Sequence, residues 1–244
     1  MRRLYSLWCQ FWFVTLFLLL FPFFWLFLQR ESWHPKAHYL NRLWGRVYFP
    51  VCGLAVSIES RQQLPVSQTY VFCANHFSYL DIAVMGVAIP HFYAFIGKSQ
   101  LTKVPLFGYM FRKLHIPVNR ENKMERYRIL QKSIHCLRHG RSIVVFPEGG
   151  IRSEHPPQMA DFKDGAFRMA IETKTPVVPI TFPYNWQILP DVGGLQFRRK
   201  PIKVIIHEPI STESLTMDDV ETLKNATFAV IDNELKKHFQ TETV

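Results

Sequence analysis

The chain has 244 residues, of which 48% are hydrophobic, and its formal net charge at pH 7 is +10. This length provides an ample core for one large domain or two small ones, and the positive excess favours an anionic partner such as lipid headgroups, a phosphorylated substrate or nucleic acid. The 4 cysteines lack C-x-x-C spacing, which excludes a disulfide framework or a cysteine zinc site and favours a reducing compartment.

Residues 4–28 carry no charged side chain. As a helix this segment is roughly 37 Å long, compared with a hydrocarbon core of about 30 Å. It is too long for a signal-peptide core and no small-residue cleavage site follows, so we expect a retained membrane anchor. Pro22 permits a kink, and both a spanning helix and a re-entrant or monotopic one are open.

The next segment, residues 33–48, is predicted to be a basic amphipathic helix lying in the membrane interface. Its apolar stripe consists of Leu40, Leu43, Trp44 and Val47, and its basic residues are Lys36, Arg42 and Arg46. The alternative is an ordinary surface helix that packs on its own domain. If the first helix spans, the basic residues after it place the rest of the chain on the cytoplasmic face of the inner (cell) membrane.

From residue 53 onward, predicted strands and helices alternate. Strands are expected at 54–58, 70–74, 92–96, 116–118, 142–146, 177–181 and 204–206, and helices at 81–89, 105–114, 121–138, 165–174 and 217–239. The alternation predicts an α/β fold, an αβ sandwich with a largely parallel central sheet, preceded by an N-terminal helical membrane anchor. We therefore divide the chain into an anchor, residues 1–50, and a second unit, residues 51–244.

The segment Asn75–Asp81 follows the predicted buried strand 70–74. His76 stands where a strand gives way to a helix, and histidine is the commonest general base. Asp81 is the nearest carboxylate that can fix its tautomer. The competing interpretation is structural, because Ser78-x-x-Asp81 ahead of an apolar run is also a helix capping box.

A second segment, Phe146–Ser153, contains Glu148, Gly149, Gly150 and Arg152. Glycines allow a close backbone approach and an anion-binding nest, and arginine adds donors that match phosphate oxygens. A plain turn is the structural alternative, and the spacing fits neither a P-loop nor a dinucleotide fingerprint. Two further cations, Lys98 and Arg120, each close a predicted strand, where ligands collect in open α/β sheets; solvated surface charge is the alternative.

Four motifs occur in a fixed order: Asn-His-x4-Asp at 75–81, Phe-Pro-Glu-Gly at 146–149, Phe-Lys-x-Gly-Ala at 162–166 and Val-Pro-Ile at 178–180. Together they resemble the glycerolipid acyltransferases, most closely the 1-acyl-glycerol-3-phosphate (lysophosphatidate) acyltransferases. The resemblance covers roughly residues 50–210, and it makes residues 51–244 an expected acyltransferase domain.

The resemblance implies that His76 is the general base and Asp81 its orienting carboxylate. It implies a substrate-binding set around the acceptor's phosphate and glycerol, made of Asn75, Lys98, Arg120, Glu148, Gly149, Gly150 and Arg152. Two positions depart from the family pattern. Gly150 and Ile151 stand where the family usually has a single threonine, and Asn119 stands where an aspartate is common.

The expected reaction moves a fatty acyl group from an acyl thioester to the 2-hydroxyl of lysophosphatidate, without an acyl-enzyme. The co-substrate is acyl-CoA or acyl carrier protein, and neither a cofactor nor a metal is expected. Ser78 and Cys73 are the candidate nucleophiles of the rival acyl-enzyme scheme, although they are better explained as a helix cap and a core residue.

The expected partners are membrane lipids, lysophosphatidate and, for one donor type, acyl carrier protein, with no nucleic acid. The nearest functional alternative is the same chemistry on another lysolipid, such as a lyso-aminolipid. A second alternative is an inactive protein that binds the membrane surface, and nucleic-acid binding is the weakest because no recognition motif accompanies the charge.

Overall fold

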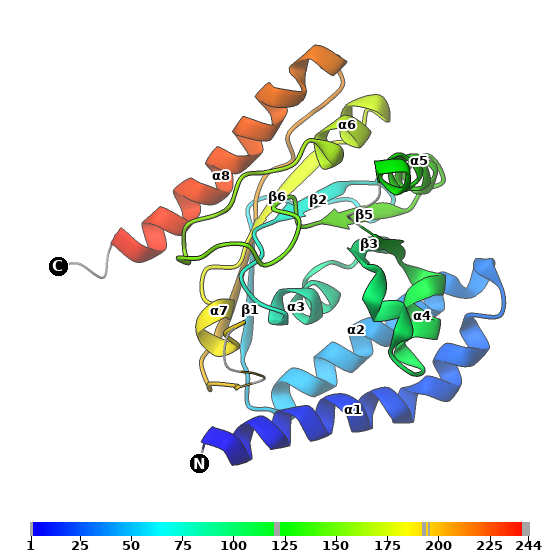
Figure 1. Ribbon diagram of the computed structural model, residues 1–244, viewed down its shortest axis with the longest axis vertical. Helices are drawn as coiled ribbons and strands as arrows, with labels where there is room; N and C mark the ends of the chain where they lie inside the picture. The colour runs from blue at the N-terminus through cyan, green and yellow to red at the C-terminus, as the bar shows by residue number, and fades with distance from the viewer. Residues whose placement is uncertain (1, 120–122, 192–193, 195, 241–244) are drawn as a thin grey trace.

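The computed structural model describes residues 2–119, 123–191, 194 and 196–240. Its centre is a 7-stranded sheet with the order β1-β7-β6-β2-β5-β3-β4, shown in Figure 1. The strands are β1 (Val56–Ser60), β2 (Val71–Ala74), β3 (Tyr93–Lys98), β4 (Ile116–Val118), β5 (Ser142–Val145), β6 (Val177–Thr181) and β7 (Ile202–Ile206). The pair β6–β7 is antiparallel and the other neighbouring pairs are parallel, which confirms the predicted fold class.

Helices cover both faces of the sheet (Figure 1). They are α1 (Arg2–Phe27), α2 (His34–Val51), α3 (Leu80–Ala88), α4 (Phe107–Leu114), α5 (Lys123–Arg138), α6 (Gly165–Glu172), α7 (Asn185–Ile188) and α8 (Val220–Gln240), with short 3₁₀ turns η1 (Glu31–Trp33), η2 (Ser99–Lys103) and η3 (Met217–Asp219). Alternate side chains of a strand point to opposite faces. Accordingly, Phe72 and Ala74 of β2 enter the core under α1–α4, whereas Val71 and Cys73 enter the core under α5, α6 and α8.

The strand connections reverse direction between β2 and β5. From β2 the chain passes through α3, on one face, to β3; from β5 it passes through α6, on the other face, to β6. Ligands of open α/β sheets bind at such a switch point, beyond the carboxyl ends of the strands. The segments that follow β2 and β5 are the two motifs that carry His76 and Glu148.

Helix α1 lies along the domain rather than apart from it. Near its start the Tyr5 hydroxyl donates to the Cys52 carbonyl (2.8 Å), and just beyond its end the Gln29 amide donates to the Tyr109 hydroxyl (3.1 Å). Between them, Phe17 and Phe24 are buried in the same core as the sheet. Among the described residues α1 is the helix long and apolar enough to cross a membrane. The division of the chain at residue 50 stays a prediction, and α1 and α2 share a core with one face of the sheet.

The predicted amphipathic stripe of α2 divides into two parts. Leu40 and Trp44 are buried against the protein, while Leu43 and Val47 are exposed, together with Tyr39. Elsewhere the predicted boundaries shift slightly: β1 begins two residues later than predicted and β7 two residues earlier. The short helix α7 was not predicted, because four residues carry no periodic signal.

Candidate active site

His76 and Asp81 form a buried pair at the carboxyl end of β2. Asp81 Oδ2 lies 3.0 Å from His76 Nδ1, and the side chains of Asp81 and His76 are 0% and 8% exposed, respectively. An acceptor at Nδ1 fixes the proton there and leaves the Nε2 lone pair to act as a base. The ring of Phe146 stacks on the imidazole with centroids 4.0 Å apart. The imidazole is thus held in one orientation on both its edge and its face.

The Asp81 carboxylate also organises the loop that carries the histidine. Its Oδ2 accepts hydrogen bonds from the Phe77 and Ser78 amides, both at 3.0 Å. Its Oδ1 accepts one from the Asn185 side chain at 2.8 Å. The bond from Ser78 N is half of the predicted capping box, while Ser78 Oγ instead accepts from Leu80 N at 3.1 Å. The capping and orienting interpretations of Asp81 are therefore compatible.

Asn185 is the site residue that sequence reasoning missed. It is 1% exposed at the start of α7, and it reaches Asp81 across 104 positions of sequence. The isolated asparagine falls in no motif. The only available signal was its place just after the predicted strand 177–181, whose carboxyl end meets the same edge of the sheet.

Glu148 links the Phe-Pro-Glu-Gly motif to the Asn-His-x4-Asp motif by a hydrogen bond. Its Oε1 accepts from the His76 backbone amide at 2.7 Å, and its Oε2 accepts from the Ala160 amide at 2.9 Å. The side chain is fully buried. Burial, with a smaller contribution from the nearby Asp81 and against the lowering effect of the two amide donors, raises the pKa of Glu148 to about 7. The carboxyl group therefore fixes the loop that holds the His76–Asp81 pair.

The raised pKa of Glu148 predicts a pH-dependent stability difference. Because the folded-state pKa lies above the unfolded value, the stability that Glu148 contributes is complete below about pH 4.3 and is lost as the pH rises through about 7. We expect Glu148→Gln to be less stable than wild type at pH 5, with a gap that narrows by pH 8. Urea unfolding at both pH values measures this, and a gap that widens with pH would contradict the assignment.

The glycines after Glu148 adopt conformations that other residues rarely take. Gly149 has φ +83° and Gly150 φ +145°. A Cβ at Gly149 would lie 2.7 Å from Lys163 Nζ, so the lysine packs directly over the turn. Lys163 belongs to the third motif, Phe-Lys-x-Gly-Ala, and its ammonium group lies at the predicted substrate-binding turn.

The other predicted substrate-binding residues are dispersed around this edge. Both amide atoms of Asn75 bond to the Phe182 backbone, at 3.0 and 2.8 Å, so this side chain joins the ends of β2 and β6. Lys98 ends β3 and is exposed, as is Arg152. Neither makes an ion pair within the described part of the chain. Arg120 lies outside the described residues.

The two candidate nucleophiles are enclosed. Ser78 is 0% exposed, and its hydroxyl donates to the Leu189 carbonyl at 2.7 Å. Cys73 is also 0% exposed within β2, and burial raises the pKa of its thiol well above the usual value. Both residues are fully buried, whereas the side chain of His76 is 8% exposed.

A family profile described as Acyltransferase matches residues 55–183. The chain is 31% identical over 78% of its length to "1-acyl-sn-glycerol-3-phosphate acyltransferase BAT2, chloroplastic" of Brassica napus, of which it covers 54%. It is 30% identical over 76% of its length to the "1-acyl-sn-glycerol-3-phosphate acyltransferase" of Saccharomyces cerevisiae, of which it covers 62%. The chain thus spans about half the length of the plant relative.

Among solved structures, the chain resembles the "1-acyl-sn-glycerophosphate (LPA) acyltransferase, PlsC, from Thermotoga maritima", with a TM-score of 0.79 over 97% of both chains. The sequence identity is 22%, so this likeness concerns the fold.

Proposed function

The chain belongs to the acyltransferase family, and on that premise we propose that it transfers a fatty acyl group from an acyl thioester to the 2-hydroxyl of 1-acyl-glycerol-3-phosphate, giving phosphatidate. The observation that carries the proposal is the buried His76–Asp81 pair, with Nδ1 and Oδ2 3.0 Å apart, at the switch point of the sheet. The names of the relatives from Brassica napus and Saccharomyces cerevisiae support this acceptor.

The transfer proceeds directly between the two substrates. Nε2 of His76 removes the proton of the 2-hydroxyl while that oxygen attacks the thioester carbonyl carbon. The tetrahedral intermediate collapses, the C–S bond breaks, and the departing sulfur takes the proton back from the imidazolium. Asp81 stabilises the imidazolium while it carries the charge.

The cations at this edge of the sheet would bind the acceptor's phosphate. Lys98, Arg152 and Lys163 come from three separate segments, and positive charges spread in this way attract a dianion from several directions. Arg120, although outside the described residues, belongs to the same proposed set. Glu148 acts indirectly, since both of its oxygens accept backbone amide protons.

An acceptor panel tests this assignment. Purified protein is supplied with acyl-CoA or acyl carrier protein as donor, and thiol release is followed with lysophosphatidate, a lyso-aminolipid or an uncharged monoacylglycerol as acceptor. We expect lysophosphatidate to be the preferred acceptor. Equal turnover of the uncharged acceptor would contradict a phosphate-selective site, and preference for the lyso-aminolipid would establish the alternative acceptor.

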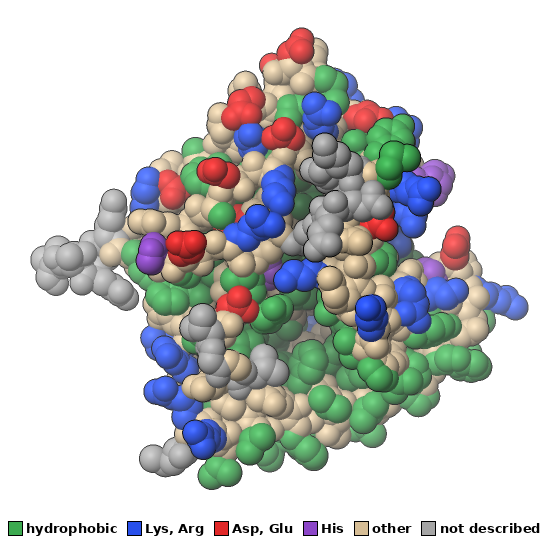
Figure 2. Space-filling model, in the orientation of Figure 1, with side chains coloured by type: hydrophobic (Ala, Val, Ile, Leu, Met, Phe, Trp, Pro, Cys, Tyr) green, Lys and Arg blue, Asp and Glu red, His purple; other side chains and the backbone are tan. Residues whose placement is uncertain are grey.

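We also propose that α1 lies in the plane of a membrane rather than across it. Its outer face is strongly apolar, with exposed Leu4, Leu7, Trp8, Phe11, Val14, Leu18, Leu19, Phe23, Trp25 and Leu26. Figure 2 shows hydrophobic side chains gathered along the lower edge of the molecule, where α1 runs. A helix bonded to its own domain from Tyr5 to Gln29 cannot leave it without breaking those contacts. The positive-inside rule orients helices that span the membrane, so it does not apply to a helix that lies in the membrane plane. The placement of the rest of the chain on the cytoplasmic face therefore stays a prediction.

If α1 docks on the membrane, negative charges introduced on its exposed face should weaken vesicle binding. Leu18 and Leu19 are 49% and 64% exposed, so the double change Leu18→Asp, Leu19→Asp leaves the core intact but places two carboxylates in the lipid. We expect vesicle binding to fall at least about tenfold, from lost apolar burial and electrostatic repulsion by anionic lipid. The matched control is Met217→Asp on η3, which is also exposed and should bind like wild type. Equal loss in both variants in a vesicle flotation assay would contradict docking through α1.

A further inference from the structure

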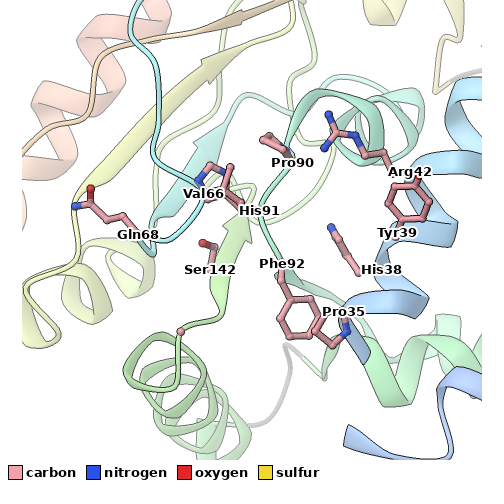
Figure 3. A pocket seen from close by; sticks show the side chains of 11 residues that line it. Pro35, His38, Tyr39, Arg42, Val66, Gln68, Pro90, His91, Phe92 and Ser142 are labelled. Atoms are coloured by element: carbon pink, nitrogen blue, oxygen red, sulfur yellow. The ribbon is translucent and has the colours of Figure 1, made fainter. Parts of the chain in front are cut away.

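A cavity of about 280 Å³ lies at the end of the sheet opposite to His76. It is formed between α2 and the amino ends of the strands, because Gln68 precedes β2, Phe92 precedes β3 and Ser142 begins β5. Figure 3 shows His38 and Arg42 projecting from α2 toward the segment that carries Pro90 and His91. The proposed acyl-transfer chemistry uses none of these residues.

Two histidines of this cavity are buried, and several of its polar side-chain atoms lack hydrogen-bond partners. His38 is 5% exposed and His91 is 1% exposed. Within the part of the chain that the structure describes, neither ring nitrogen of His38 has a hydrogen-bond partner, nor do Arg42 Nε and His91 Nδ1. The backbone of His91 lies close enough to the His38 ring to raise the pKa of His38, although neither ring nitrogen forms a hydrogen bond of normal geometry within the described residues. Buried polar groups are normally satisfied, so several unsatisfied groups around one cavity indicate a ligand.

The charge of the cavity selects an anion. Arg42 lines it, and among the described lining residues there is no aspartate or glutamate. Burial lowers the pKa of His38 and, together with the positive charges of Arg141 and Arg42 and against the raising effect of the His91 backbone, brings it to about 4. Burial and Arg42 also lower the pKa of His91. Arg42 therefore lies close enough to both imidazoles to lower their pKa values, and it forms no ion pair with a carboxylate of the described residues.

The hydrogen-bond pattern narrows the choice of anion. His91 Nε2 lies 3.0 Å from the Pro65 carbonyl, so this nitrogen carries the proton and Nδ1 of the neutral ring is an acceptor. Arg42 offers only donors, and neutral His38 offers one donor and one acceptor. The complementary ligand therefore has anionic oxygens and also an O–H group. A carboxylate lacks the O–H group, whereas a phosphate that retains one proton has both.

We propose that this cavity is a second binding site, distinct from the acyl-transfer site, which takes a phosphate monoester through Arg42, His38 and His91. The phosphate can belong to the headgroup of a membrane lipid or to a soluble molecule. The site lies partly on α2, which packs against α1 and whose Tyr39, Leu43 and Val47 are exposed, and a lipid headgroup is therefore one of the two sources to be tested.

The test uses the full-length protein in detergent, with inorganic phosphate as the first probe. Phosphate should raise the melting temperature, since a ligand that binds only the folded state stabilises it, and it should shift the ¹⁵N resonances of the His38 and His91 rings. Arg42→Gln should weaken phosphate binding about tenfold or more, the loss of a charge-assisted hydrogen bond. Arg46→Gln, one turn further along α2 and exposed, is the matched control and should bind as wild type.

A second set of probes separates the sources of the ligand. Vesicles containing phosphatidate, a monoester, are compared with phosphatidylglycerol vesicles of equal surface charge. A shift of the His38 resonances by phosphatidate vesicles alone identifies a lipid headgroup, and a shift by free phosphate at lower concentration identifies a soluble ligand. These resonances report this cavity, so binding of phosphatidate at the acyl-transfer site does not affect the conclusion.

The proposal is overturned by unchanged His38 and His91 resonances with both probes, or by equal responses to acetate and phosphate. Equal phosphate binding by the Arg42→Gln and Arg46→Gln proteins would also overturn it. If the Arg42→Gln protein fails to fold, the response of the His38 and His91 resonances of the wild-type protein still decides the test.

Discussion

Replacement of His76 by alanine is expected to lower acyl transfer by about 10²–10⁴-fold, the usual contribution of a positioned general base. The fold should survive, because the bond from the His76 backbone amide to Glu148 does not need the imidazole. The lost side-chain contacts are the stacking on Phe146 and the bond to Asp81. Thiol release with saturating lysophosphatidate, together with the circular dichroism of each protein, measures both points.

The matched controls for His76 are the two enclosed candidate nucleophiles. Ser78→Ala removes the bond to the Leu189 carbonyl and should cost about 1–2 kcal/mol of stability, while retaining activity within about tenfold. Cys73→Ala leaves a small cavity in the core under α5, α6 and α8, and this variant should likewise stay active. If Ser78→Ala or Cys73→Ala were as inactive as His76→Ala while folded, the direct-transfer mechanism would be wrong.

Replacement of Asp81 by asparagine should lower activity by about 10⁴-fold, as expected when the carboxylate of a histidine pair becomes a neutral amide. In wild type, Oδ2 accepts from His76 Nδ1 and from the Phe77 and Ser78 amides, and Oδ1 accepts from Asn185. The NH₂ group of an asparagine must face either the Asn185 amide or the donors around Oδ2, and in both arrangements the imidazole loses the negative charge that stabilises its protonated form.

Asn185→Ala distinguishes the orientation of His76 from general disturbance around the carboxylate. This variant removes the Oδ1 partner at 2.8 Å but preserves the contact between His76 and Asp81. We expect the activity of this variant to fall about tenfold or less, mostly through a lower kcat. An Asp81→Asn protein that is no less active than Asn185→Ala would show that the carboxylate has no orienting role.

The sequence was sufficient for the fold class because each core strand is a short apolar run with a helix after it. Such runs place β2, β5 and β6 in a parallel sheet, and the four ordered motifs identify the family. The strand order could not be predicted, because the alternation of strands and helices does not determine that β5 lies between β2 and β3. The position of α1 could not be predicted from the sequence either. The composition of α1 shows that its surface is apolar, but only the hydrogen bonds of Tyr5 and Gln29 show that the helix lies on the domain.

At the site, the local pair was predictable and the distant partners were not. His76 and Asp81 are 5 residues apart, so one loop brings them together. The contacts of Asp81 with Asn185 and of His76 with Glu148 join residues 104 and 72 positions apart, and only the sheet order makes them neighbours. The resemblance implied that Asn75 belongs to the substrate-binding set, which stays a prediction; in the structure both polar atoms of its side chain bond to the Phe182 backbone.

The most direct measurement uses an acyl-labelled thioester mixed with stoichiometric purified protein, first without an acceptor and then with lysophosphatidate. We expect neither thiol release nor protein-bound label in the first stage. In the second stage we expect one thiol and one phosphatidate per thioester consumed, at a rate that depends on His76. Thiol release with label retained on the protein before any acceptor is added would contradict direct transfer.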